Sequence, residues 1–150
     1  MAQKYVSGVT DHTTRQAPLS ASALFTGKTV GEDPDLTRAS ESVGFIVLES
    51  SHGFLGNIEY EARVGAATIK GIDNGPPFAY AFDSPFAGIP DGALTTLAGV
   101  KGVDGGWVQT YGAQSLTDHW CALSVDEDQA RDSERTHSAE QVAYFAFDAD

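Results

Sequence analysis

The segment that decides the fold runs from Val125-Asp126-Glu127-Asp128, across a short polar stretch, into Thr136-His137-Ser138-Ala139-Glu140-Gln141-Val142-Ala143-Tyr144-Phe145-Ala146-Phe147-Asp148. The first part is acidic, and the last part is an apolar run of strand length that contains valine, tyrosine and phenylalanine. These residue types are enriched in β-strands, and carboxylates before such a run are typical of a turn. The segment therefore predicts an acidic loop that leads into a central strand.

The same arrangement occurs earlier, between Val30 and Glu49. A shift of 95 positions places residues 20–33 on 115–128, and a shift of 99 positions places 37–49 on 136–148. We interpret this as an internal repeat within one domain, with 1–53 as a partial copy and 54–150 as the complete copy. The alternative is chance similarity between two strand–loop–strand segments.

Acidic and basic positions coincide in the two copies. Glu32-Asp33 aligns with Glu127-Asp128, Arg38 with His137, and Glu41 with Glu140. Because a histidine in one copy is an arginine in the other, we expect a structural role for this position, through its charge or its hydrogen bonds.

The composition favours an all-β fold. The chain has 16 glycines, six prolines and many short apolar runs, which is typical of strands joined by frequent turns. We expect loops at 50–53 and 71–77. The sequence predicts a single β-sandwich, jelly-roll or immunoglobulin-like, of about nine strands, at residues 5–9, 23–30, 43–49, 58–64, 78–82, 93–100, 107–111, 119–125 and 142–147.

The charge excludes some classes of partner. Nine lysines and arginines against 21 aspartates and glutamates give a net charge of −12, so the basic surface that nucleic-acid binding needs is missing. Adsorption to an anionic membrane is disfavoured for the same reason. No apolar run reaches the roughly 18 residues of a membrane span, so membrane insertion is not expected.

Residues 1–5 lack the apolar core of a secretion signal. We therefore expect a cytoplasmic protein, a virion component or a fragment of a secreted, extracellular protein.

The single cysteine, Cys121, stands in an apolar segment beside Trp120. A nucleophilic cysteine needs a base and an electropositive setting, and His119 is its only neighbour in the sequence with base chemistry. We expect a buried structural thiol, with a His119–Cys121 pair as the alternative.

Two signatures carry a family resemblance. One is Gly27-Lys28-Thr29-Val30-Gly31-Glu32-Asp33-Pro34-Asp35-Leu36-Thr37-Arg38 with the strand at 43–49. The other is Gly105-Gly106-Trp107, then Val125-Asp126-Glu127-Asp128-Gln129, then residues 132–144. Together they resemble a β-rich repeat module near the C-termini of large extracellular proteins of marine and planctomycete-type bacteria. The resemblance implies a noncatalytic accessory role beside adhesive or polysaccharide-degrading domains.

The acidic loops suggest a cation site. Hard carboxylate oxygens at close spacing suit Ca²⁺, which is the one candidate cofactor, although the spacing does not match an EF-hand. The alternative is that these carboxylates cap turns, pair with arginines and face water. The candidate metal ligands are Asp126, Glu127, Asp128, Asp132 and Glu134.

Aromatic residues suggest a second kind of site. Flat rings on the surface of a sandwich can stack on sugars, whereas the alternative is that they pack in the core. The candidate ligand-binding residues are Trp107, Tyr111 and Trp120.

We expect no catalytic residues and no enzymatic activity. Residues 132–138 combine Asp132, Ser133 and His137, but they lie too close along the chain for a catalytic triad, and no nucleophile elbow is present. The alignment of Glu140 with Glu41 favours a structural role for both.

Two functions remain open. The first is a noncatalytic binding or adhesion module for a polysaccharide or a cell surface, stabilised by Ca²⁺. The second is a structural assembly protein, such as a phage capsid decoration protein, a tail protein or a surface-lattice component, that contacts protein surfaces or forms a homo-oligomer.

Overall fold

The structure is a computed structural model and describes residues 34–35, 37, 39–40, 42, 48–99, 101–102 and 104–149. All seven strands of the described part lie between residues 51 and 148. They are β1 (Ser51–Leu55), β2 (Ile58–Val64), β3 (Phe78–Ala81), β4 (Gly92–Leu97), β5 (Gly106–Thr110), β6 (Trp120–Glu127) and β7 (Val142–Asp148), with one 3-10 turn, η1 (Ile72–Asn74), between β2 and β3.

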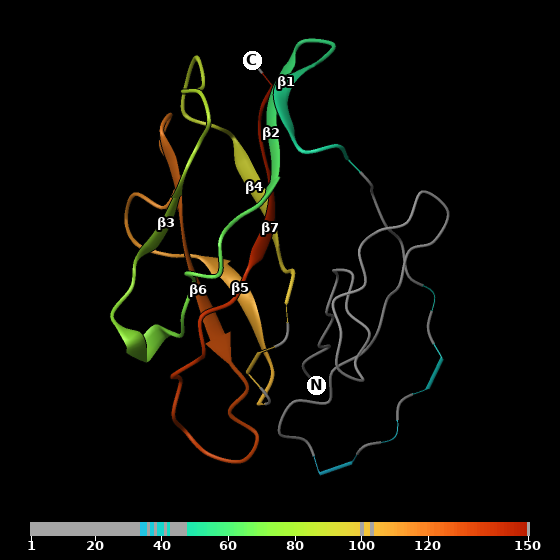
Figure 1. The fold of residues 1–150 in the computed structure, drawn as a ribbon, viewed down its shortest axis with the longest axis vertical. Helices are drawn as coiled ribbons and strands as arrows, with labels where there is room; N and C mark the ends of the chain where they lie inside the picture. The colour runs from blue at the N-terminus through green and yellow to red at the C-terminus, as the bar shows by residue number, and fades with distance from the viewer. Residues whose placement is uncertain are drawn as a thin grey trace.

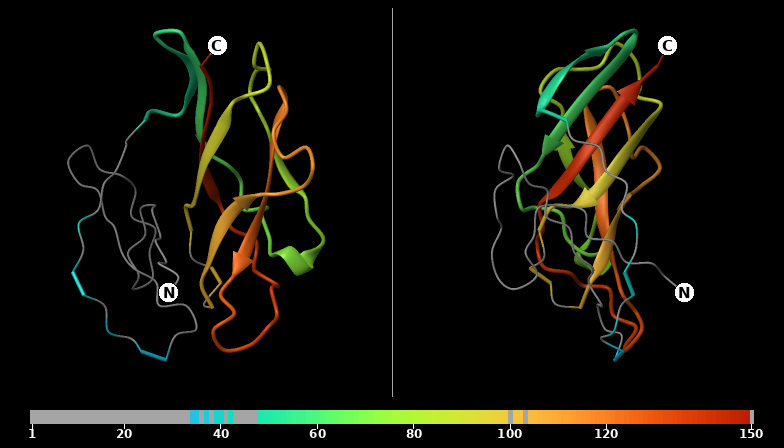
Figure 2. Two further views of the ribbon diagram at one scale, coloured as in Figure 1. Left: turned by 180° about the vertical axis from the view of Figure 1, so that it is seen from behind. Right: turned by 90° about the vertical axis from the view of Figure 1, so that its right-hand side faces the viewer.

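The strands form two antiparallel sheets that pack face to face (Figures 1 and 2). The four-stranded sheet has the order β1-β2-β7-β4, and the three-stranded sheet has the order β3-β6-β5. The turn between β1 and β2 lies at one end of the sandwich, and the loop between β6 and β7 lies at the opposite end (Figure 1).

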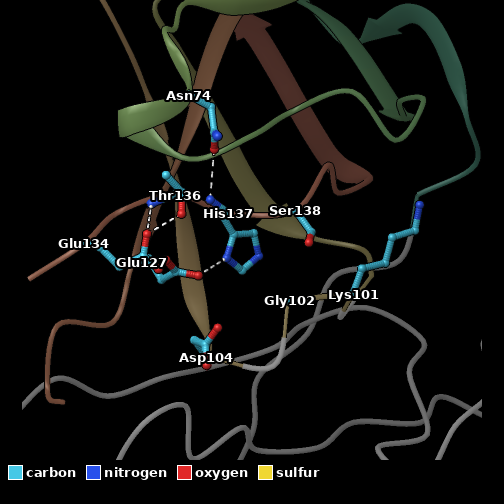
Figure 3. A pocket seen from close by; sticks show the side chains of 9 residues that line it. All are labelled: Asn74, Lys101, Gly102, Asp104, Glu127, Glu134, Thr136, His137 and Ser138. Atoms are coloured by element: carbon cyan, nitrogen blue, oxygen red, sulfur yellow. Dashed lines mark hydrogen bonds and ion pairs between the residues drawn. The ribbon is translucent and has the colours of Figure 1, made fainter. Parts of the chain in front are cut away.

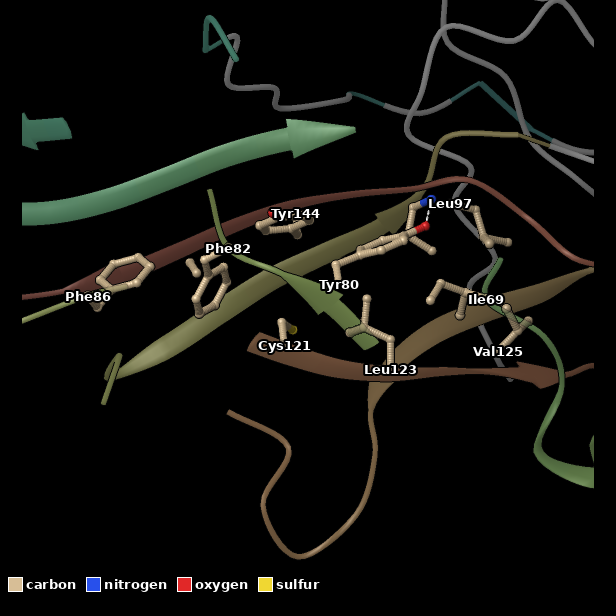
Figure 4. Packing of buried hydrophobic residues seen from close by; sticks show 11 residues of the cluster. Ile69, Tyr80, Phe82, Phe86, Leu97, Cys121, Leu123, Val125 and Tyr144 are labelled. Carbon is tan, nitrogen blue, oxygen red and sulfur yellow. Dashed lines mark hydrogen bonds between the residues drawn. The ribbon is translucent and has the colours of Figure 1, made fainter. Parts of the chain in front are cut away.

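The core lies between the sheets and follows from strand alternation (Figure 4). On β6, Cys121, Leu123 and Val125 point inward, and on β7 Val142 and Tyr144 do so. Alternate residues of a strand face opposite sides of a sheet, so one run of apolar residues supplies the core from each sheet. Complete burial of a side chain such as Leu123 stabilises the fold by about 1.5–3 kcal/mol.

The all-β sandwich that the sequence predicts is confirmed. Six of the expected strands are present within a few residues of their expected bounds, whereas those expected at 5–9, 23–30 and 43–49 fall wholly or largely outside the described residues.

The prediction of a loop at residues 50–53 is wrong, because β1 begins at Ser51. Ser51, His52 and Gly53 have little strand propensity of their own, but each pairs with a residue of β2 across the turn at Gly56. Strand pairing overrides local propensity here. β1 also crosses the boundary at 53/54 that the sequence repeat suggests.

The finer description of the sandwich also needs correction. The described chain has seven strands rather than about nine, and its layers of four and three strands are not a jelly-roll, which has eight strands. An immunoglobulin constant domain also has layers of four and three, but there the second strand lies between the first and the fifth. In this chain β2 lies between β1 and β7.

Candidate functional site

The end of the sandwich that carries the β6–β7 loop contains a polar pocket of about 430 Å³ (Figure 3). Three parts of the chain form it: the 3-10 turn η1, the connection from β4 to β5, and the end of β6 with the loop that follows. The lining residues are Asn74, Lys101, Gly102, Asp104, Glu127, Glu134, Thr136, His137 and Ser138.

Short-range hydrogen bonds shape the loop that carries most of these residues. The Asp132 carboxylate accepts a bond from the Glu134 amide, and the Glu134 carboxylate accepts bonds from the amide and the hydroxyl of Thr136. Acidic side chains that bond to amides two residues further on are a common way to build a turn. The Glu134 carboxylate is thereby held at the pocket.

Asn74 connects this loop to the 3-10 turn. Its side-chain oxygen accepts bonds from the His137 amide and the Gly71 amide, each at 2.9 Å. The amide of His137 is therefore fixed by a side chain that lies 63 residues earlier in the chain.

His137 lies between two buried glutamates. Its Nδ1 is 2.7 Å from Glu127 Oε1, and its Nε2 is 3.5 Å from Glu140 Oε1. The three residues are 5%, 3% and 0% exposed, respectively, so water contributes little to their solvation. The contact between His137 Nε2 and Glu140 is an ion pair only, since Nε2 has no hydrogen-bond partner.

Glu140 is also anchored by the backbone. Its Oε1 accepts bonds from the amides of Lys101 and Gly102. Gly102 is required at its position, because a Cβ there would overlap the ring of His137. The β4–β5 connection thus closes directly over the histidine.

The environment shifts the proton affinities of all three groups. Burial acts to lower the pKa of His137, but the two flanking carboxylates outweigh it, so the pKa is raised above its ordinary value. Burial acts to raise the pKa of Glu140, but His137 and the amides of Gly102 and Lys101 lower it overall. Burial dominates at Glu127, whose pKa is raised although His137 acts in the opposite direction. The two carboxylates thus favour the protonated, cationic form of His137.

The sequence repeat agrees with this arrangement. Glu127, His137 and Glu140 are the residues that align with Glu32, Arg38 and Glu41, and those three lie outside the described residues. An arginine in the histidine position is a permanent cation, so both copies provide one cationic side chain and two carboxylates.

Five carboxylates were expected to bind a metal ion, and the structure separates them. Glu127 and Glu134 line the pocket. Asp126 instead pairs with Arg135 at 2.7 Å, whereas Asp128 and Asp132 accept bonds from the amides of Ala130 and Glu134, respectively. The turn-capping and arginine-pairing alternative thus describes these three.

Among the residues that the structure describes, no group of three or more histidine, cysteine, aspartate or glutamate side chains is arranged to hold a metal ion.

A second histidine cluster lies toward the other end of the sandwich, and the sequence analysis missed it. His52 Nε2 is 2.9 Å from Glu59 Oε1, and His52 Nδ1 is 3.2 Å from Glu61 Oε2. Glu59 and Glu61 alternate with other residues along β2, a pattern that is typical of a strand with one side facing solvent. Both are buried, because they point between the sheets toward His52 and the loop after β3.

The expected aromatic residues lie along the three-stranded sheet. Trp107 and Trp120 are 38% and 39% exposed, while their neighbours Val108 and Cys121 pack in or against the core. Both tryptophans therefore point to the outer face of this sheet. Tyr111 is half-buried just after β5, and its amide donates to the Ala122 carbonyl, which places it between the two tryptophans along β6.

The alternative role of a reactive thiol does not fit the structure. Cys121 is completely buried, and burial raises the pKa of its thiol to about 12. His119 precedes the start of β6 and lies at the surface, next to Asp118. The expectation of a buried structural thiol is confirmed.

Comparisons with protein-family models, with curated proteins and with solved structures give no match for this chain. In the described part of the chain, no helix has the length and apolar character to cross a membrane.

Proposed function

We propose that this chain is a noncatalytic binding and adhesion module that recognises a carbohydrate polymer, including one displayed on a cell surface. The observation that carries the proposal is the position of its two tryptophans. Both are more than one-third exposed on the outer face of the same sheet, although tryptophan is on average a highly buried residue.

The spacing of the rings suits an extended ligand. Trp107 pairs with Asp126, six residues along β6 from Trp120, which corresponds to roughly 20 Å at about 3.3 Å per residue. Tyr111 lies between them along β6, so the three aromatic residues span more than the length of a single sugar. The apolar faces of several sugars of a polymer would stack on such a row.

Polar groups accompany the rings. Asp126 lies opposite Trp107 in the sheet and pairs with Arg135, whose Nε and terminal nitrogen both donate to Asp126 Oδ1. Charged groups beside an aromatic ring can bind the hydroxyl groups of a stacked sugar.

A polysaccharide pull-down followed by calorimetry with the bound polymer tests the proposal. Trp107→Ala and Trp120→Ala should each weaken binding about 30-fold, corresponding to roughly 2 kcal/mol for an aromatic anchor. Leu94→Ala is the matched control, because Leu94 is 60% exposed on the other sheet and should leave the affinity unchanged. Failure to bind any polysaccharide, with or without Ca²⁺, would contradict the proposal.

The second candidate function, a structural assembly protein such as a virion or surface-lattice component, is favoured by a different surface. On the outer face of the four-stranded sheet, Val64 and Leu94 are 54% and 60% exposed. Beside them, the rings of Tyr60 and Phe147 lie 5.7 Å and 5.6 Å from that of Phe145. An apolar face of this kind suits contact with a second copy of the chain.

Size-exclusion chromatography with light scattering distinguishes this second function. An assembly protein should associate as its concentration rises, and Leu94→Lys should keep it monomeric. A wild-type chain that stays monomeric at every concentration would count against assembly and leave the carbohydrate proposal untouched.

A further inference from the structure

One buried oxygen in the polar pocket lacks a partner. Glu127 is 3% exposed, and its Oε1 is bonded to His137, whereas its Oε2 has no hydrogen-bond partner. Buried polar atoms are nearly always paired, and an orphaned one indicates a group that protein atoms alone do not supply. A water, a proton or a cation can supply the missing partner of this carboxylate oxygen.

The neighbour of Glu127 on this wall of the pocket is the Glu134 carboxylate (Figure 3). The two side chains lie within hydrogen-bond reach of each other, and this contact adds to the larger effect of burial in raising the pKa of Glu127. Two ionised carboxylates repel each other, so the contact is favourable only when a proton or a cation lies between them. One oxygen of Glu134 accepts bonds from the amide and the hydroxyl of Thr136.

The balance of acidic and basic side chains at the site favours a divalent cation. The carboxylates of Asp104, Glu127 and Glu134 line the pocket, and Glu140 adjoins it through His137. Against these four carboxylates stand two basic side chains, Lys101 and His137, so acidic groups outnumber basic ones at the site.

We propose that a hard divalent cation, Ca²⁺ or Mg²⁺, binds in this pocket between Glu127 Oε2 and the Glu134 carboxylate. Protein side chains provide only two charged ligands, so water and neutral oxygens complete the coordination shell. Both ions accept such mixed oxygen shells, and a site with few protein charges belongs to the weak range, with Kd of about 10⁻⁴–10⁻³ M.

The site differs from the set of five carboxylates that the sequence suggested. It keeps Glu127 and Glu134 and omits Asp126, Asp128 and Asp132, which already bond to Arg135 or to turn amides. Binding would join the end of β6 to the loop before β7. The site is independent of the aromatic row, so its failure and that of carbohydrate binding are separate outcomes.

Calorimetric titration of the full chain, freed of metal with a chelator, tests the site with CaCl₂ and MgCl₂ in separate arms. One equivalent of either ion should bind, and the ratio of the two affinities identifies the preferred ion. At a tenfold excess over Kd, the midpoint of thermal unfolding should rise by about 3–6 °C.

Glu134→Gln is the decisive variant. Glu134 is exposed, so the change should leave the fold intact while it weakens binding at least tenfold. Glu127→Gln should have the same effect. Asp118→Asn removes one charge from a surface residue beside His119, away from the pocket, and should bind as the wild type does.

Three results would overturn the proposal. If neither ion gives a heat of binding or a shift in the midpoint of unfolding, Glu127 and Glu134 share a proton instead. Unchanged affinity in Glu134→Gln and Glu127→Gln would place the bound ion elsewhere. Loss of affinity in Asp118→Asn equal to that in the two glutamine variants would show a general effect of net charge.

Discussion

The described part of the chain contains two histidines that each lie between two glutamates, and the hydrogen bonding of the two clusters differs. In the cluster at His52, every glutamate oxygen has a hydrogen-bond partner. Glu59 bonds to His52 and to the Ala87 amide, and Glu61 bonds to Tyr144, to His52 and to the Asp83 amide. Its one orphaned atom is Arg63 Nε, 3.8 Å from Glu61 Oε1.

In the cluster at His137, three atoms lack a hydrogen-bond partner: Glu127 Oε2, His137 Nε2 and Glu140 Oε2. One of these glutamates borders a polar pocket, whereas Glu59 and Glu61 are satisfied by backbone and side chains. Similar residue types can therefore form either a closed hydrogen-bond network or an open site. The two clusters differ in the number of glutamate oxygens that have no hydrogen-bond donor.

The largest expected effect is on the closed network. Glu61→Ala would leave Tyr144, His52 and the Asp83 amide without their acceptor inside the sandwich. Removal of one member of a buried, hydrogen-bonded charge network costs about 3–5 kcal/mol of the free energy of unfolding. Urea unfolding measures this loss of free energy. Glu49→Ala, at an exposed position, is the control and should change the free energy of unfolding by less than about 0.5 kcal/mol. A change in Glu61→Ala as small as the control would show that the network is not stabilising.

An intermediate effect is expected at Gly102, which lies against His137. In Gly102→Ala the new methyl group would displace the imidazole ring and cost about 1–3 kcal/mol. Gly53→Ala is the matched control, because the nearest atom to its new Cβ would be 3.9 Å away. Equal stability of the two variants in thermal unfolding would mean that the open cluster tolerates a shifted histidine.

The smallest expected effect is the dependence of stability on pH. Because the pKa of His137 is raised above the ordinary value of 6.5, the folded protein holds this proton more tightly than the unfolded chain does. The resulting stabilisation is complete below about pH 6.5 and is lost as the pH rises through the folded-state pKa.

His137→Gln should remove this loss, so the unfolding midpoint should fall less between pH 6 and pH 8 (roughly the range in which histidine titrates) than in the wild type. His119→Gln, in which an exposed histidine is replaced, should keep the wild-type dependence. An unchanged pH profile in His137→Gln would assign the dependence to another group.

The fold was largely predictable, because burial in a two-layer sandwich leaves a pattern in the sequence. The alternation of residues 142–148 and the apolar run of 120–125 identify β7 and β6 directly. β1 was not predictable, since Ser51, His52 and Gly53 become a strand only through their pairing with β2.

The candidate site was predictable in part. The sequence identified the acidic loop after β6 and, through the repeat, the equivalence of His137 with Arg38. It could not separate Glu127 and Glu134 from Asp126, because all three are acidic and close along the chain. Their separation depends on Arg135, which pairs with Asp126.

The sequence by itself determined the class of fold and the acidic character, since these follow from residue types and their spacing. Only the tertiary structure decided which carboxylates already accept hydrogen bonds from other parts of the chain. That depends on donors that lie far away in the chain, such as the amides of Lys101 and Gly102 on Glu140 and of Asp83 on Glu61. A hydrogen bond between distant residues leaves no periodic trace in a sequence, whereas the burial of a strand face does.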